Sequence, residues 1–281
     1  MHDFGTTRGL IFTADDFGLH PAVNEAVEIA HREGVLTAAS LMVGAPAAAG
    51  AVACARRLPA LRVGLHIVLA DGPAVLTRAQ IPSLLDANGR FSRRMAWNGV
   101  RFFFRPDLRR QLLAEIRAQF AAFAATGLPL DHVNTHKHFH LHPTLLALIL
   151  RVGRDYGLRS MRLPAERGGP IFLRPWVRLV ARRLNSAGVA HNDSVIGIRQ
   201  SGRMTETVVL EALHLLRDGL TEIYLHPATS SGRVISASMP EYRHSDELTA
   251  LTSSRVRTAV KELGISTGGF SDFLAPKTRV A

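Results

Sequence analysis

The chain has 281 residues, 47% of them hydrophobic, and a formal charge of +11. This length suits one large α/β barrel or two small domains, and because no linker, repeat or low-complexity run divides the sequence, we expect a single domain over residues 1–281. The single cysteine, Cys54, excludes an intrachain disulfide, and the first residues lack the pattern of a secretory signal, so a cytoplasmic location is expected.

Segments of strand and helix character alternate along the chain. Strands are expected at residues 10–14, 37–43, 61–69, 130–134, 158–163, 194–198, 220–225 and near 265. Helical spacing of apolar residues predicts helices at 21–33, 47–57, 106–125, 144–156, 173–184, 206–217 and 246–263, with an irregular insert at about 70–105. Alternation of this kind predicts a parallel sheet, most simply a TIM-like (β/α) barrel of seven or eight strands, regular or irregular. A doubly wound open sheet is the alternative, although no Gly-rich phosphate fingerprint follows the first strand.

The positive charge comes from 34 Lys and Arg against 23 Asp and Glu, and the arginines are scattered. Such a balance is typical of proteins that bind nucleic acid, an anionic membrane or a phosphorylated partner. No RNA- or DNA-binding motif accompanies it, so nucleic acid is not an expected partner. In residues 90–110, basic and aromatic residues interleave, as on surfaces that contact anionic lipid headgroups. A long barrel loop with a buried aromatic anchor is the alternative interpretation.

Polar residues follow the predicted strands at their carboxyl ends, where a (β/α) barrel builds its active site. They are Asp15 and Asp16 after the first strand, His66 in the third, His136 after the fourth, Arg162 at the end of 158–163 and His226 after 220–225. Two adjacent carboxylates at the end of an apolar strand need a cation or a shared proton to offset their repulsion. Capping of the following helix is the other explanation of the acidic pair. An Asp with two His residues is a ligand set for a divalent ion with open positions, as in catalytic zinc sites.

Four histidines, His136, His138, His140 and His142, recur at every second residue. On a continued strand, successive members would lie roughly 6 to 7 Å apart, so one ion could not bind them all. We therefore expect His136, nearest the strand end, to be a ligand, and His138 or His140 to line the pocket or to hydrogen-bond a ligand. A solvent-exposed run that binds metal adventitiously is the alternative.

Five ordered motifs resemble those of the YdjC-like carbohydrate deacetylases. They are TADDFG at residues 13–18, GLH at 64–66, NTHKH at 134–138, MRLP at 161–164 and LHP at 225–227, so the resemblance covers nearly the whole chain. Through residues 100–105 and 136–143, the chain is most similar to the branch associated with hopanoid biosynthesis.

This resemblance implies a metal-dependent deacetylase on a (β/α) barrel. By position, Asp16, His66 and His136 would hold a divalent ion, Zn or Mg, with Asp15 as general base and His226 as general acid. Arg162 would orient Asp15 or the substrate, or form a structural ion pair. Many relatives have Asp-Ser where this chain has Asn134 and Thr135, so the amide brings no charge to the ion; Asn134 is assigned with His138 and His140 to the substrate pocket.

The implied substrate is an N-acetylated sugar or glycolipid, and in the hopanoid branch an N-acetylglucosaminyl hopane. A glycolipid substrate would explain why residues 90–110 contact an anionic membrane. Such contact would place the protein peripherally at the inner membrane face. A monomer and a homodimer both agree with the sequence. The alternatives are a deacetylase of soluble chito-oligosaccharides, a metal-dependent phosphoesterase, and a non-catalytic protein that binds membrane or nucleic acid.

Overall fold

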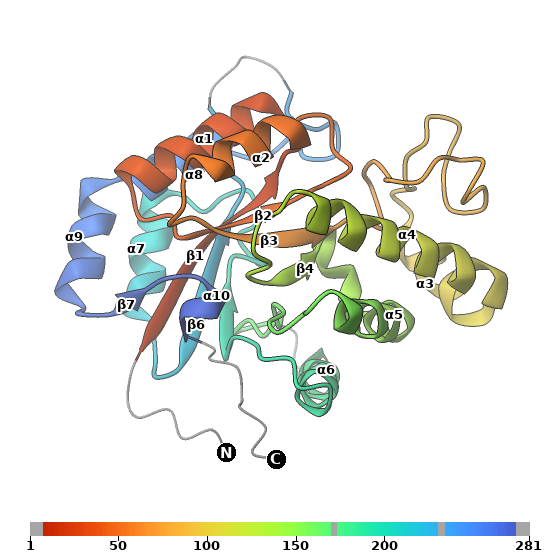
Figure 1. Cartoon of the computed structure of the whole chain (residues 1–281). Coiled ribbons are helices and arrows are strands. Elements are labelled where there is room, and N and C mark those ends of the chain that lie inside the picture. Colours follow the sequence, from red (N-terminus) through yellow and green to blue (C-terminus); the bar gives the residue numbers. More distant parts are fainter. Residues whose placement is uncertain (1–7, 170–172, 230–233, 274–281) are drawn as a thin grey trace.

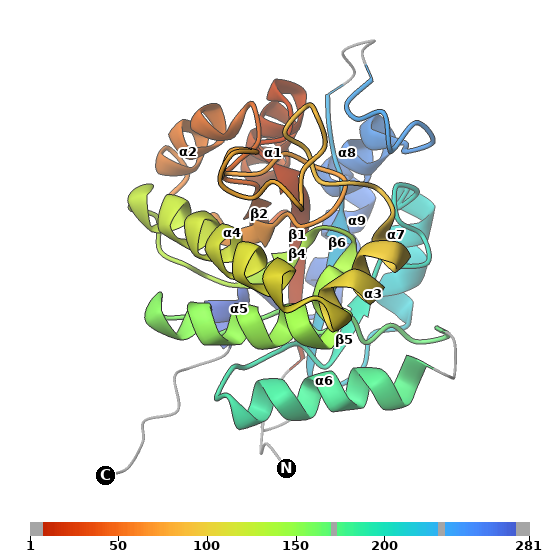
Figure 2. The same ribbon diagram turned by 90° about the vertical axis from the view of Figure 1, so that its right-hand side faces the viewer.

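A curled parallel sheet lies at the centre of the computed structural model, which describes residues 8–169, 173–229 and 234–273 (Figures 1 and 2). Its strands are β1 (Gly9–Phe17), β2 (Ala38–Leu41), β3 (Arg62–Ile67), β4 (Val133–Thr135), β5 (Ser194–Ile196), β6 (Leu220–Leu225) and β7 (Ser266–Thr267). Their order is β4-β3-β2-β1-β6-β5, with β7 paired to β1, and every pairing is parallel. The predicted α/β class with a parallel sheet is therefore confirmed.

The described strands form a half-barrel, and the predicted strand 158–163 is reduced to two bridges. Val133 of β4 pairs with Met161, and Ser160 pairs with Ala190, just before β5. Beyond these bridges, the backbone of Leu163 is hydrogen-bonded by a side chain instead of by a neighbouring strand. The Asn192 amide accepts from the Leu163 N–H at 2.8 Å and donates to the Leu163 carbonyl at 2.8 Å. Within the ranges that the structure describes, a complete ladder of seven or eight strands is not seen.

Helices surround the sheet (Figures 1 and 2). They are α1 (Pro21–Glu33), α2 (Ala48–Arg56), α3 (Met95–Phe104), α4 (Pro106–Ala125), α5 (Pro143–Asp155), α6 (Arg174–Ser186), α7 (Glu206–His214), α8 (His244–Thr252), α9 (Ser254–Glu262) and α10 (Phe270–Phe273), with a 3₁₀ segment, η1 (His136–Leu141). Three of them begin at a proline, whose missing N–H is no loss in the first turn. Among the described residues, none of the helices is long and apolar enough to cross a membrane.

Two predicted segments differ from the structure. The single helix expected at 246–263 is broken at Ser253, which is extended and whose side-chain oxygen accepts from the N–H groups of Arg255 and Val256, so that α9 starts with a cap. The insert at 70–105 is not wholly irregular, because it contains α3.

The central strand β1 is buried over all nine residues and pairs with β2 on one side and β6 on the other. A strand covered on both faces requires a continuous apolar run, as in residues 10–12. Because the strands are parallel, their carboxyl ends meet at one edge of the sheet, and the polar residues singled out above follow those ends.

Candidate metal and catalytic site

Asp15 and Asp16 lie near the end of β1, where its pairing with β2 is irregular. The register shifts between Ala14 and Phe17, and Asp16 has a left-handed backbone with φ of 62°. Such a conformation costs a non-glycine residue about 1 to 3 kcal/mol and is typical of functional sites. A bulge redirects side chains, and here it gives the two carboxylates different partners.

Three potential ligand atoms converge at this end of the sheet. Asp16 Oδ1 lies 3.3 Å from His66 Nε2 and 3.1 Å from His136 Nδ1, and the two nitrogens are 3.4 Å apart. All three residues are buried, and neither Asp16 oxygen has a hydrogen bond of good geometry within the described ranges. Ligands about 2.1 Å from a tetrahedral ion would stand about 3.4 Å from one another. The donor set therefore fits a divalent cation, and the three residues predicted as ligands lie together.

The Asp16 carboxylate is ionised in this arrangement. Burial by itself would raise its pKa, but His136 and His66 beside it hold the pKa well below the usual range of a carboxyl group. A charged oxygen and two imidazole nitrogens are thus available on one side of the site.

Asn134 lies next to His66 on the neighbouring strand and is fully buried. The two residues are register partners on β3 and β4, which brings the amide oxygen within 2.6 Å of His66 Nδ1. The amide nitrogen donates to Asp15 Oδ1 at 3.1 Å and to Ser40 Oγ at 2.8 Å. Since both amide hydrogens are used, the oxygen accepts from His66 Nδ1–H, which leaves Nε2 as the nitrogen that faces Asp16 and can bind a cation.

Arg162 is fully buried between two carboxylates. It donates to both oxygens of Asp15, at 2.5 and 3.0 Å, and to both oxygens of Glu222 on β6, each at 2.8 Å. Its guanidinium also lies 4.5 Å from the centre of the Tyr224 ring. Burial would raise the pKa of Asp15, but Arg162 and His66 hold it well below the usual value. Both roles left open for Arg162, ion pair and orientation of Asp15, agree with this contact.

Glu222 was not predicted as a site residue. The sequence signal was a single acidic residue within the apolar strand LTEIYL. A buried carboxylate requires a partner, so this position could have been singled out on physical grounds.

His226 follows β6 and is 8% exposed. Its backbone N–H donates to Glu247 of α8, and its carbonyl accepts from His244 Nδ1 at 2.6 Å. Burial lowers the pKa of His226 to about 4, against the opposing effect of Asp16 and Asp15. Both carboxylates therefore act on this imidazole, which is uncharged at neutral pH.

The histidine run does not share one face, because the strand ends at Thr135. Lys137 and His138 are both left-handed, with φ of 57° and 53°, and turn the chain into η1. Only His136 joins the converging ligand atoms. None of the four histidines is exposed, which argues against the solvent-exposed run considered above.

The other three histidines have separate partners. His138 Nε2 lies 3.1 Å from the Tyr224 hydroxyl, and His140 Nδ1 lies 2.8 Å from Thr135 Oγ1. His142 Nε2 donates to the carbonyl of Gly99 in α3 at 2.9 Å.

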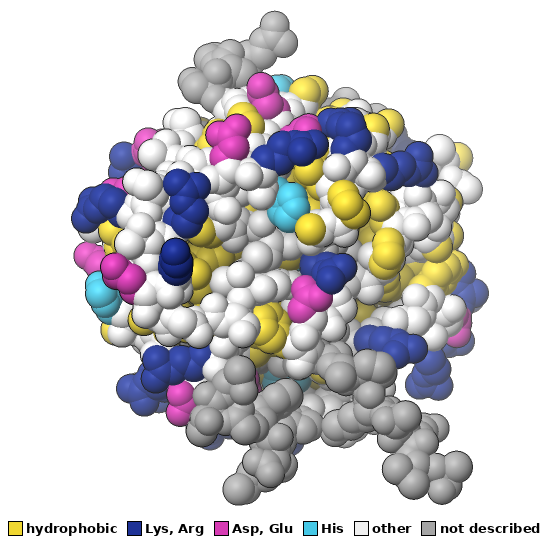
Figure 3. Space-filling model, turned by 60° about the vertical axis from the view of Figure 1, so that its left-hand side comes forward, with side chains coloured by type: hydrophobic (Ala, Val, Ile, Leu, Met, Phe, Trp, Pro, Cys, Tyr) yellow, Lys and Arg dark blue, Asp and Glu magenta, His cyan; other side chains and the backbone are white. Residues whose placement is uncertain are grey.

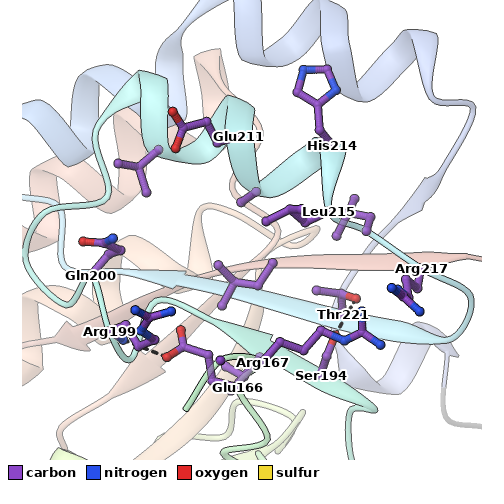
Figure 4. Close-up of a pocket in the computed structure, with 16 residues that line it drawn as sticks. Glu166, Arg167, Ser194, Arg199, Gln200, Glu211, His214, Leu215, Arg217 and Thr221 are labelled. Atoms are coloured by element: carbon purple, nitrogen blue, oxygen red, sulfur yellow. Dashed lines mark hydrogen bonds between the residues drawn. The ribbon is translucent and has the colours of Figure 1, made fainter.

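Two cavities lie beside β5 and residues 166–168, and none of the candidate metal ligands lines either one. One of about 640 Å³ is lined by His138, Leu141, Leu173 and Val177, under the start of α6. A second, of about 460 Å³, lies between β5, β6 and α7, and residues such as Glu166, Arg199, Leu215 and Thr221 line it (Figure 4). None of the candidate ligands lines the second cavity, so it is separate from the cation site.

The profile of one protein family, described as YdjC-like protein, matches residues 9–262. The chain belongs to the YdjC-like family. Two relatives named carbohydrate deacetylase are similar over nearly their whole length. The relative from Brevibacillus brevis is 30% identical, and the match covers 94% of this chain and 98% of the relative. The relative from Geobacillus stearothermophilus is 31% identical, and the match covers 95% of this chain and 98% of the relative.

A solved structure supports the same family fold. A protein of Enterococcus faecalis V583, described as a cellobiose-phosphate cleavage protein, superposes on this YdjC-like chain with a TM-score of 0.78 and 25% identity. The match covers 95% of this chain and 99% of the other.

Proposed function

We propose that this YdjC-like protein is a metal-dependent deacetylase that hydrolyses the N-acetyl group of an N-acetylglucosaminyl substrate. The observation that carries the proposal is the convergence of Asp16, His66 and His136 next to Asp15 and near His226. Support for the reaction also comes from relatives named carbohydrate deacetylase that span nearly the whole chain.

An acetamide resists hydrolysis because its carbonyl is a poor electrophile and its amine a poor leaving group. A divalent cation held by Asp16, His66 and His136, zinc being preferred over magnesium by the two imidazoles, would polarise the carbonyl and lower the pKa of a water molecule. Asp15, kept ionised by Arg162, would accept the proton of the attacking water. Because His226 is uncharged at neutral pH, it would first take up the proton that Asp15 removes from the water and would then give that proton to the departing nitrogen.

Acetate release tests the proposal. After treatment with a chelator and addition of Zn²⁺ or Mg²⁺, the protein should release acetate from an N-acetylglucosaminyl lipid. Asp16→Ala and His66→Ala should each lower the rate by more than about 100-fold, because each removes a ligand. His31→Ala, a partly buried histidine of α1 outside the site, is the control. Acetate from neither lipid nor chitobiose would exclude a deacetylase, and release of phosphate from phosphate monoesters instead would favour a phosphoesterase.

A glycolipid is the proposed form of the substrate, with an N-acetylglucosaminyl hopane as the specific case. The cavity at His138 supports this, because Leu141, Leu173 and Val177 offer an apolar place for an aglycone. Acetate from chitobiose alone would assign the enzyme to soluble sugars instead.

A glycolipid substrate implies a peripheral position at the inner membrane face, and α3 supports it. Trp97, Val100, Phe103 and Phe104 are 60, 53, 48 and 73% exposed, and exposed arginines at 94, 105, 109 and 110 flank them. Apolar side chains surrounded by cations are typical of surfaces that bind anionic lipid. By contrast, basic side chains on the face shown in Figure 3 are scattered among acidic ones.

We further propose that the half-barrel closes as an irregular (β/α) barrel forming one domain. The bridges of Met161 to Val133 and of Ser160 to Ala190 support this, because they connect β4 to the segment that leads into β5. Since β5 pairs with β6 and β6 with β1, closure through these bridges would complete a ring.

A further inference from the structure

Three residues outside the proposed ligand set form a buried array in the order Ser, His, Asp. Ser40 Oγ lies 3.0 Å from His132 Nε2, and His132 Nδ1 lies 2.8 Å from Asp131 Oδ2. These distances match those of a hydrolase triad. Ser40 and His132, however, are 0% exposed, so no substrate could reach the hydroxyl, and the array has a different role.

The array continues to the cation site through Asn134. The Asn134 amide donates to Ser40 Oγ at 2.8 Å, and its oxygen is 2.6 Å from His66 Nδ1. The opposite orientation of the amide would place its oxygen against the Asp15 carboxylate at 3.1 Å, which is repulsive. The orientation of the amide is therefore fixed by charge.

Each contact in the series then has one direction. Burial would raise the pKa of Asp131, but His132 and Ser271 lower it to about 2, so the carboxylate can only accept, and His132 Nδ1–H donates. His132 Nε2 accepts from the Ser40 hydroxyl, and the Ser40 oxygen accepts from Asn134. The Asn134 oxygen must in turn accept from His66 Nδ1–H.

We propose that Asp131, His132, Ser40 and Asn134 form a buried relay that fixes the tautomer of His66, so that Nε2 presents its lone pair to the cation. The inference rests on the proposed function only in taking Asp16, His66 and His136 as ligands. The four are positioning residues, since they act through His66.

Packing holds the centre of the buried relay in place. A Cβ atom at Gly64 would lie 2.5 Å from His132 Cε1 and Nε2, so this glycine makes room for the ring. Phe270 of α10 stacks on His132, with ring centres 4.9 Å apart. Asp131 accepts from the N–H groups of Phe270, at 3.1 Å, and Ser271, at 2.9 Å. The glycine of the GLH motif therefore makes room for His132, which acts on the motif's own His66 through the buried relay.

The test reads the tautomer of His66 in the metal-free protein by ¹⁵N NMR, at a pH high enough for the ring to be neutral, because Asp15 and Asp16 raise its pKa. The zinc affinity is measured separately by competition with a chelator. Ser40→Ala breaks the buried relay between His132 and Asn134. We expect a second tautomer of His66 to appear and zinc affinity to fall by about 10- to 100-fold. Ser40→Cys, which keeps a weak donor and acceptor, should give an intermediate result.

The matched control is Ser160→Ala, an equally buried serine outside the buried relay, which should change neither readout. A single unchanged tautomer and zinc affinity within twofold of the parent in Ser40→Ala would overturn the inference. If Ser40→Ala does not fold, Ser40→Cys and His132→Gln apply the same criteria. An inactive parent protein with the expected tautomer shift would overturn the deacetylase proposal and leave the buried relay intact.

Discussion

Arg162 shows how single residues compensate charge in the interior of this protein. One guanidinium serves Asp15 and Glu222 together, and Glu222 also accepts from the Thr13 hydroxyl at 2.7 Å. Removing one partner of a buried ion pair typically costs about 3 to 5 kcal/mol, because the other charge stays buried. Stability and the ionisation of Asp15 thus depend on the same side chain.

Arg162→Met should lower the free energy of unfolding by about 3 to 5 kcal/mol, measured by urea denaturation. Arg162→Lys, which keeps the charge but loses the bidentate contacts, should lose less. Without the Arg162 guanidinium the pKa of Asp15 rises, so the acidic limb of the pH–activity profile should move to higher pH. Arg117→Met, whose pair with Asp155 is exposed, should cost less than about 1 kcal/mol. Equal losses for Arg162→Met and Arg117→Met would contradict this account.

At the residue scale, the sequence pointed to the residues that converge and to two that contact them, Arg162 and Asn134, but not to Glu222, Ser40 or His132. Asp16, His66 and His136 are among six residues that follow strands whose carboxyl ends meet at one edge, and the family resemblance selected these three as ligands. Ser40 and His132 could not be predicted, because they lie 92 residues apart in the chain and only the fold brings them together. The catalytic roles of Asp15 and His226 stay predictions.

Among the elements, α3 connects the molecular surface to the cation site. Its buried face packs on η1, where Phe102 lies 5.8 Å from Phe139 between ring centres. Figure 2 brings α3 to the front, outside α5. The sequence did not predict this helix because Gly99 and the three consecutive phenylalanines at 102–104 have low helix propensity. The strand at 158–163 was overestimated because its ladder is replaced by the Asn192 side chain.

Phe104→Ser should weaken binding to vesicles of phosphatidylglycerol and phosphatidylcholine by at least about 10-fold. Transfer of a phenylalanine side chain from water is worth about 1.5 to 3 kcal/mol, and about 1.4 kcal/mol is a factor of ten. Cosedimentation measures the binding, and a blue shift of Trp97 emission in a Trp176→Phe background locates the contact. Leu215→Ser is the control, because Leu215 is an apolar residue 69% exposed after α7. Equal binding of the two variants would argue against α3 as the contact surface.

For the whole molecule, buried histidines link stability to pH. Burial lowers the pKa of His226 to about 4 and of His140 to about 3, whereas an unfolded histidine titrates near pH 6.5. Unfolding therefore takes up protons below about pH 6.5, and stability falls as the pH falls. Glu247 opposes this between about pH 4.5 and 7, because burial raises its pKa to about 7 and it holds a proton that the unfolded chain releases.

His226→Gln should remove one proton from this uptake. The slope of unfolding free energy against pH between 6.5 and 4.5 should decrease by about 1.4 kcal/mol per pH unit, as measured by urea titration in chelator. His214→Gln, an exposed histidine at the end of α7, serves as the control. An unchanged slope in His226→Gln would show that the imidazole is not buried in its neutral form.

The burial of the four alternating histidines has a practical consequence. A nickel resin captures chains through accessible imidazoles, and this stretch of sequence looks like an affinity tag. In the folded protein none of the four is exposed, so this run of histidines should bind the resin only after the chain unfolds. The fraction of the protein that this run retains on the column would then report the fraction of unfolded chains.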